Sequence, residues 1–182
     1  MTTGRIELGP TGRTVAANVK RLREGRGLTL RALSKALREK GRPLSADALN
    51  KIENGASEEP RPIRRVDADD LVALAVALDV HPAALLLPHT AASDQTAIIT
   101  TAGEVPARRA WEWAHGMRPL REDQDRGWLR FRLNALPEAW RAISARQYAE
   151  WSAHQAKKEY EHILEQTGFN PDGTRREGGD DG

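Results

Sequence analysis

The chain has 182 residues, of which 30% are charged and 39% hydrophobic, and it contains no cysteine. This length suits one ordinary domain or two small ones. The lack of cysteine excludes a disulfide framework, a thiol nucleophile and any zinc or iron–sulfur site ligated by cysteine. No apolar run approaches the roughly 18 residues of a membrane span, and the N-terminal sequence lacks the apolar core of a signal peptide. We therefore expect no membrane partner and a cytoplasmic location.

Charge is unevenly distributed along the chain, although the formal net charge is only +2. Residues 1–66 hold 15 basic and 7 acidic side chains, whereas residues 67–104 hold 6 acidic side chains and no Lys or Arg. A small region with such an excess of positive charge suits a polyanion such as nucleic acid. A solvated cationic surface has the same composition, so charge alone leaves both interpretations open.

Aromatic residues divide the chain into two parts. None occurs before Trp111, and all five Trp, both Tyr and both Phe lie from there onward. One hydrophobic core is therefore expected to be aliphatic and the other rich in Trp. Small polar residues after Pro88 are typical of a linker. These patterns predict a flexible N-terminus (1–11), a first domain (12–88), a linker (89–102), a Trp-rich second domain (103–169) and a disordered tail (170–182).

The first domain shows the periodicity of short helices and no alternating strand pattern. Apolar residues three or four positions apart give each of the first four helices one buried face. Gly25 ends the first helix, and Thr29 and Ser45 are expected to cap the second and third. The apolar faces are Val15, Val19 and Leu22; Leu30, Leu33 and Leu37; Leu49 and Ile52; and Leu71, Leu74 and Leu78.

The remainder of this domain is a loop followed by two helices. Residues 56–66 contain two prolines and are typical of a loop. Asp67 and Asp70 resemble a capping box at the start of the fourth helix. A short fifth helix begins at His81-Pro82 and ends before Pro88. The sequence thus predicts five helices.

Two motifs in this domain resemble those of a known family. The third predicted helix ends in Lys51-Ile52-Glu53-Asn54-Gly55, and the fourth reads Leu71-x-x-Leu-Ala-x-Ala-Leu-x-Val80. Together with residues 27–34, they resemble the Xre/lambda-repressor-like helix-turn-helix family over residues 14–88. The resemblance implies a five-helix DNA-binding domain and a sequence-specific transcriptional repressor of the phage immunity type. With the small, mostly helical second domain, the expected fold class is mainly α.

Two departures from the family bear on how the domain meets DNA. Leu30 stands where the family often has a Gln that braces backbone and base contacts, so that contact is absent. Residues 38–43 lengthen the turn between the second and third helices and keep it cationic. The docking pose is therefore expected to differ in detail, while the major groove remains the expected site.

The third predicted helix, about residues 45–54, is the expected recognition helix. Its apolar residues face the core, which leaves the opposite face for base edges in the major groove. Asn50 can pair with adenine, Lys51 with guanine or a phosphate, and Asp47 with cytosine. The expected base-reading residues are Ala46, Asp47, Asn50 and Lys51.

Backbone contacts are expected from helix N-termini and from basic side chains around the recognition helix. The expected set is Thr29, Arg31, Lys35, Arg42, Ser45, Arg61, Arg64 and Arg65. Helix capping alone also accounts for Thr29 and Ser45, and simple solvation accounts for Lys35. Glu53 is expected to bond a basic residue of the first helix, such as Arg23.

The second half of the chain gives less decisive patterns. Residues 105–116 fit a short helix, and residues 127–133 alternate in a way that fits a half-buried strand or a short helix. Ser144 to Gln147 resemble a capping box that opens a long helix ending at Gly168. Arginines interleaved with Trp suit a second DNA surface formed by Arg108, Arg109, Arg130 and Arg132. A Trp core with a solvated Arg rim is the alternative interpretation.

The sequence gives no support for catalysis or cofactor binding. The five His show no metal-ligand spacing, and neither a phosphate-binding Gly-rich loop nor a nucleophile motif occurs. We expect no enzyme activity, no catalytic residue, no metal and no cofactor. The leading hypothesis is a repressor that binds operator DNA as a homodimer or as a monomer with two DNA-contacting regions. The alternative is an antitoxin or regulatory adaptor whose C-terminal half binds a protein partner.

Overall fold

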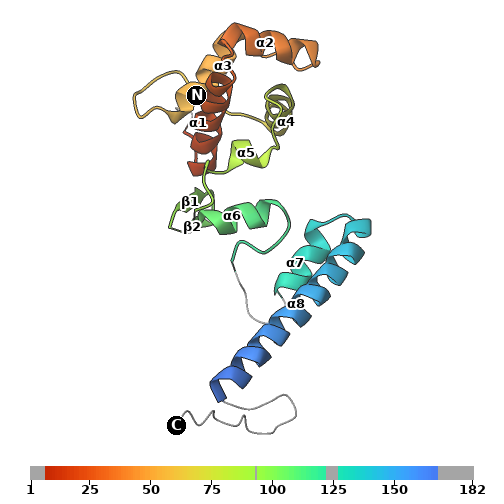
Figure 1. Ribbon diagram of the computed structural model, residues 1–182. Helices are drawn as coiled ribbons and strands as arrows, with labels where there is room; N and C mark the ends of the chain where they lie inside the picture. The colour runs from red at the N-terminus through yellow and green to blue at the C-terminus, as the bar shows by residue number, and fades with distance from the viewer. Residues whose placement is uncertain (1–6, 93, 122–126, 168–182) are drawn as a thin grey trace. The chain divides into compact units, whose positions relative to one another are not determined.

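The computed structural model describes residues 7–92, 94–121 and 127–167 (Figure 1). Helices dominate these residues, and their strands form one two-stranded sheet. The mainly α class predicted from the sequence is therefore confirmed. The chain divides into two compact units, residues 1–128 and 129–182. Among the described residues, no helix combines the length and the apolar character needed to cross a membrane.

The first unit opens with three helices whose ends follow the local sequence. Pro10 suits the start of the first helix because its missing N–H needs no partner there. Gly27 has a φ of 65° just after that helix ends, a conformation that strains other residues. The elements are α1 (Pro10–Gly25), α2 (Leu30–Glu39), α3 (Ala46–Glu53) and the 3-10 turn η1 (Asn54–Ala56).

Two further helices, α4 (Ala68–Ala77) and α5 (Ala83–Leu86), follow the loop after η1. Asp67 caps α4 by accepting a hydrogen bond from the Asp70 N–H at 2.7 Å. This contact confirms the part of the predicted capping box in which Asp67 is the cap. The Asp70 carboxylate has other partners, which are arginines.

Aliphatic side chains from α1 to α5 form one core. Contacts join α1 to α3, η1 and α5, and join α2 to α3 and α4. Burying one such side chain fully contributes about 1.5–3 kcal/mol, so this cluster is the main source of stability for the first five helices. Its large fully buried members are Val19, Leu33, Leu37, Leu49, Ile52, Leu74, Leu78 and Leu85.

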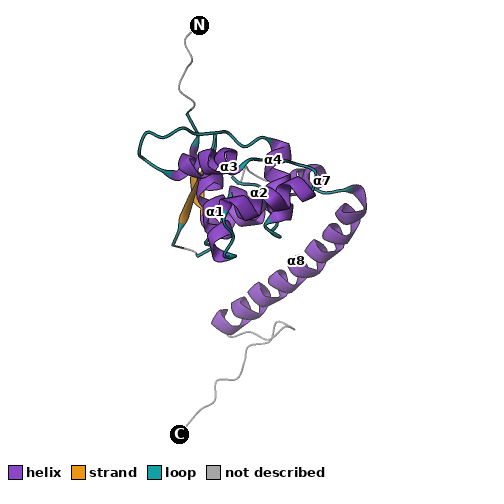
Figure 2. Ribbon diagram, turned by 90° about the horizontal axis from the view of Figure 1, so that it is seen from above, coloured by secondary structure: helices purple, strands orange, loops and turns teal. Residues whose placement is uncertain are grey.

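A hairpin and one helix complete the first unit. Strands β1 (Thr96–Ile99) and β2 (Gly103–Pro106) pair antiparallel, with Ala97 opposite Val105. Helix α6 (Ala107–Ala114) follows directly and contacts both strands. Figure 2 shows the strands beside α1, in agreement with the contacts between α1 and β1.

The hairpin differs from the linker expected over residues 89–102. Ala97, Val105 and Ala110 are buried together with Ala83 and Leu87 of the α5 region. Trp111 Nε1 donates to the carbonyl oxygens of both Pro88 and Thr90, each at 3.1 Å. The first unit therefore continues past residue 88, because the hairpin and α6 cover apolar surface at its end.

The remaining helices are α7 (Gly127–Ala135) and α8 (Glu138–Thr167). Residues 127–133 form the helix rather than the strand of the two alternatives. Ser144 lies inside α8 and not at its start, because the helix runs on from Glu138 without a break. Trp140 is 62% exposed, so its side chain is not part of a buried Trp core among the described residues. The expected tail, residues 170–182, and residues 1–6 of the expected flexible N-terminus lie outside the described residues.

Candidate nucleic-acid interface

Helix α3 is fixed by one buried face and by a capped first turn. Leu49 and Ile52 lie in the core. The Ser45 hydroxyl oxygen accepts a hydrogen bond from the Ala48 N–H at 3.0 Å, which satisfies a donor that the helix itself cannot pair. The opposite face of α3 is turned to solvent.

The predicted base-reading residues are accessible to different degrees. Asp47 and Asn50 are exposed, whereas Lys51 and Ala46 are half-buried. Lys51 Nζ lies 2.7 Å from an oxygen of Asp47, one helical turn away, so the two charges partly cancel. Within the described part of the chain, the Asn50 side chain makes no hydrogen bond. Its amide NH2 donor and its carbonyl oxygen acceptor are therefore both available to a ligand.

A buried ion pair lies under α3. Glu53 accepts from Arg23 Nε at 2.7 Å and from Arg23 Nη2 at 2.8 Å, a bidentate contact between α3 and α1. The hydrogen bonds to Glu53 raise the pKa of the Arg23 guanidinium. The predicted bond between Glu53 and the first helix is confirmed. This contact holds α3 in a fixed orientation against α1.

The start of α2 carries three of the predicted backbone-contacting residues. Thr29 caps the helix, its hydroxyl oxygen accepting from the Ala32 N–H at 3.1 Å. The hydroxyl keeps its proton for donation to another acceptor. Arg31 is exposed, and so is Lys35, whose Nζ lies 3.9 Å from a Glu39 oxygen. Such a long contact between exposed groups holds Lys35 only weakly.

Two other arginines predicted to contact DNA bind a buried carboxylate within the chain. Asp70 has no exposed surface, and its two oxygens lie 3.0 Å from Arg42 Nε and 2.7 Å from Arg64 Nη2. Arg42 also lies 2.9 Å from Asp67. A buried carboxylate is costly unless it is paired, so Asp70 holds Arg42 and Arg64 at the start of α4.

These contacts affect the ionisation of the cluster. The hydrogen bond from the Asp70 N–H, with the nearby charges of Arg42 and Arg64, lowers the pKa of the Asp67 carboxyl. The hydrogen bond to Asp70 raises the pKa of the Arg42 guanidinium. The sequence showed Asp70 only as a capping-box residue. Its partners lie 28 and 6 positions away, and no local pattern identifies them.

The loop after η1 is tied to the end of α3. The Arg64 N–H donates to the Lys51 carbonyl oxygen at 3.0 Å, and Asn54 Nδ2 donates to the Pro62 carbonyl oxygen at 3.1 Å. In this loop Arg61 pairs with Glu59. The exposed Arg65 donates to the carbonyl oxygen of Glu7 at 3.0 Å.

The arginines of the predicted second DNA surface belong to two parts of the chain. Arg108 and Arg109 lie on α6, and both reach Glu112, at 3.2 and 3.6 Å. Arg130 and Arg132 lie on α7, where Arg130 is exposed and Arg132 half-buried. The α6 pair falls in the first unit and the α7 pair in the second.

Comparison of the chain with models of protein families, with curated proteins and with solved structures finds no match in any of the three. Among the described residues, no group of three or more His, Asp or Glu is arranged to hold a metal ion.

Proposed function

We propose that residues 10–88 bind double-stranded DNA in a sequence-specific manner and act as a transcriptional repressor. The observation that carries the proposal is α3. The exposed polar face of α3 carries Asn50, whose side chain has no intramolecular partner among the described residues. On the opposite face, the ion pair between Glu53 and Arg23 fixes α3 against α1. In this proposal α2 and α3 form the helix-turn-helix of a five-helix domain.

The recognition step follows from the chemistry of the exposed face. A helix of this kind fits the major groove, and the Asn50 amide can donate to N7 and accept from N6 of one adenine. Lys51 can reach a guanine or a phosphate only after it leaves Asp47, its present partner. Asp47 then becomes free to accept from cytosine N4. We infer that Asn50 is the main base-reading residue.

The arginines predicted to contact phosphate fall into two groups, according to whether they already form an ion pair within the chain. Arg31 and Arg65 make no ion pair within the described residues, so they are available to phosphates. Arg42 and Arg64 would have to leave a buried carboxylate first, which is unfavourable. We therefore assign phosphate contacts to Arg31, Arg65 and the helix start at Thr29, and a structural role to Arg42 and Arg64.

A second candidate function is an adaptor or antitoxin whose C-terminal half binds a protein. Leu133, Trp140 and Tyr160 are 46%, 62% and 49% exposed on α7 and α8. Exposed apolar side chains that form a contiguous patch are typical of surfaces that bind a protein partner. Purification of the full chain from its host, followed by mass spectrometry, would show a stoichiometric protein partner if this function holds.

The test of the DNA-binding proposal is selection of duplexes from a random pool with the full chain. An enriched motif is expected. Asn50→Ala should lose about 1–3 kcal/mol on that motif and relax preference at one base position. Val72→Ala, at an exposed position of α4 outside the proposed interface, is the matched control. Lack of enrichment with the wild-type chain, or an unchanged motif with Asn50→Ala, contradicts the assignment.

A further inference from the structure

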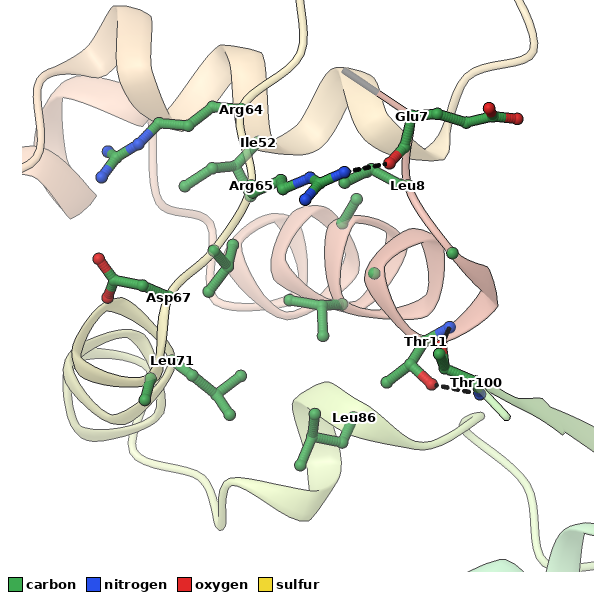
Figure 3. A pocket seen from close by; sticks show the side chains of 16 residues that line it. Glu7, Leu8, Thr11, Ile52, Arg64, Arg65, Asp67, Leu71, Leu86 and Thr100 are labelled. Carbon is green, nitrogen blue, oxygen red and sulfur yellow. Dashed lines mark hydrogen bonds between the residues drawn. The ribbon is translucent and has the colours of Figure 1, made fainter. Parts of the chain in front are cut away.

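A cavity of about 410 Å³ lies in the first unit between α1, α4 and the loop after η1 (Figure 3). The cavity is partly open to solvent, and its volume lies within the range of about 300–1,000 Å³ that is typical of small-molecule pockets. Its walls include the small residues Gly12 and Ala16 of α1 and Ala68 of α4, and Leu8 packs beside Gly12.

The interior of the cavity is aliphatic. Figure 3 shows Ile52, Leu71 and Leu86 around the hollow, which they reach from α3, α4 and α5. Val15 and Val66 also line it, and none of the lining residues is aromatic. Such walls offer dispersion contacts to a flexible hydrocarbon chain and no stacking surface to a flat ring.

A single guanidinium dominates the mouth of the cavity. Arg65 extends over the hollow to donate to the carbonyl oxygen of Glu7, while the Glu7 carboxylate points away (Figure 3). Arg64 and Asp67 also line the cavity, but their charges are engaged at the start of α4. Among the described residues, no carboxylate forms an ion pair with Arg65. A carboxylate accepts a stronger hydrogen bond from a guanidinium than a carbonyl oxygen does.

We propose that this cavity binds a free single-chain aliphatic carboxylate. The chain lies against Ile52, Leu71 and Leu86, and the carboxylate replaces the Glu7 carbonyl as the acceptor of Arg65. Because Arg65 is also assigned a phosphate contact, the bound carboxylate competes with DNA for the same guanidinium and lowers DNA affinity. This last consequence alone rests on the proposed function.

The test uses decanoate, titrated calorimetrically into the full chain without DNA and below its micelle concentration. Saturable binding of one decanoate per chain is expected, with decylamine at least tenfold weaker. Ala68→Phe should plug the cavity and weaken binding at least tenfold, whereas Val72→Phe, on the same helix but outside the cavity, should not. Arg65→Gln should weaken decanoate binding at least tenfold, whereas Arg61→Gln should stay within twofold of wild type.

Folding of each variant is checked by circular dichroism, and Leu71→Trp replaces Ala68→Phe if the latter is misfolded. Absence of saturable decanoate binding overturns the proposal, and so does binding that survives both the plug and Arg65→Gln. Binding to phosphatidylglycerol vesicles without binding to decanoate overturns it in favour of a membrane lipid. Once an enriched duplex is known, decanoate should weaken its binding at least threefold. If decanoate leaves the DNA affinity unchanged, the cavity remains a carboxylate-binding site and only the proposed competition with DNA is contradicted.

Discussion

Thr100, in the turn of the hairpin, completes the first turn of α1 through reciprocal hydrogen bonds with Thr11. The Thr11 N–H donates to the Thr100 hydroxyl oxygen at 3.3 Å, and the Thr100 N–H donates to the Thr11 hydroxyl oxygen at 3.0 Å. The cap residue of α1 is Gly9, which has no side chain to accept from that turn. A Cβ at Gly9 would lie 3.2 Å from Thr100 Oγ1, so its absence gives Thr100 room to approach.

This relationship predicts a stabilising role for a hydroxyl far from the core. Thr100→Val removes the hydroxyl and keeps the shape, and we expect it to lower the free energy of unfolding by about 0.5–2 kcal/mol, as loss of a cap does. Thr100→Ser keeps the hydroxyl and should remain close to wild type. Urea denaturation followed by circular dichroism measures both. Equal stability of Thr100→Val and wild type would show that solvent replaces the bond without cost.

Fragment lengths test whether the hairpin and α6 belong to the first unit. Residues 1–92 keep the aliphatic core but expose Leu87 and lose both hydrogen bonds of Trp111 Nε1. We expect this fragment to fold and to be less stable than residues 1–121 by about 2–4 kcal/mol, from the lost burial and hydrogen bonds. Thermal and urea unfolding of the two fragments provide the comparison. Identical stability would restore the expected boundary near residue 88.

Most of the features predicted correctly from the sequence are determined by neighbouring residues, although the bond between Glu53 and Arg23 joins residues 30 positions apart. Thr29, Ser45 and Asp67 were expected to cap helices, and each accepts a hydrogen bond from the N–H three positions later. These contacts depend on residues within one helical turn, so a local pattern is sufficient to identify them.

Several features that the sequence did not reveal join distant segments. The contact of Thr100 with Thr11 spans 89 positions, and that of Arg42 with Asp70 spans 28. A short run such as residues 96–99 carries too few positions for its alternation to distinguish a strand from a linker. In the candidate interface, the exposed face of α3 was predictable from its apolar spacing. The capture of Arg42 and Arg64 was not, because it depends on where the chain brings a buried carboxylate.

The depressed pKa of Asp67 predicts a contribution to stability that acid removes. A carboxyl whose pKa is lower in the folded state stabilises the fold above its unfolded value, about 4, and loses this effect as the pH falls through the folded value. Asp67→Asn keeps a capping residue but cannot ionise. The stability difference between wild type and this variant should therefore be largest near neutral pH and shrink below pH of about 4.

Urea unfolding at a series of pH values checks this prediction. Asp69→Asn removes a neighbouring exposed carboxylate, 3.9 Å from Arg42, and serves as the control for loss of one negative charge. A difference between wild type and Asp67→Asn that stays constant through the acid range would mean that the lowered pKa of Asp67 has no thermodynamic effect.

The two adjacent arginines of the loop after η1 are expected to separate stability from DNA binding. Arg64 holds the buried Asp70 at 2.7 Å, so Arg64→Ala should lower the free energy of unfolding by about 1.5–3 kcal/mol, the range for a hydrogen bond to a charged group. Arg65 is exposed and bonds only a carbonyl oxygen among the described residues. Arg65→Ala should therefore leave stability nearly unchanged.

Their effects on DNA should be the reverse. Loss of one phosphate contact reduces the slope of log affinity against log salt by about 0.9, and we expect this change for Arg65→Ala on cognate and random duplexes alike. Arg64→Ala, measured at a temperature where it is folded, should keep the wild-type slope because Asp70 already neutralises that cation. A reduced slope for Arg64→Ala with unchanged stability would mean that Arg64 leaves Asp70 on DNA. In that case Asp70 would bind Arg64 in the free protein, and Arg64 would exchange this carboxylate for a DNA phosphate on binding.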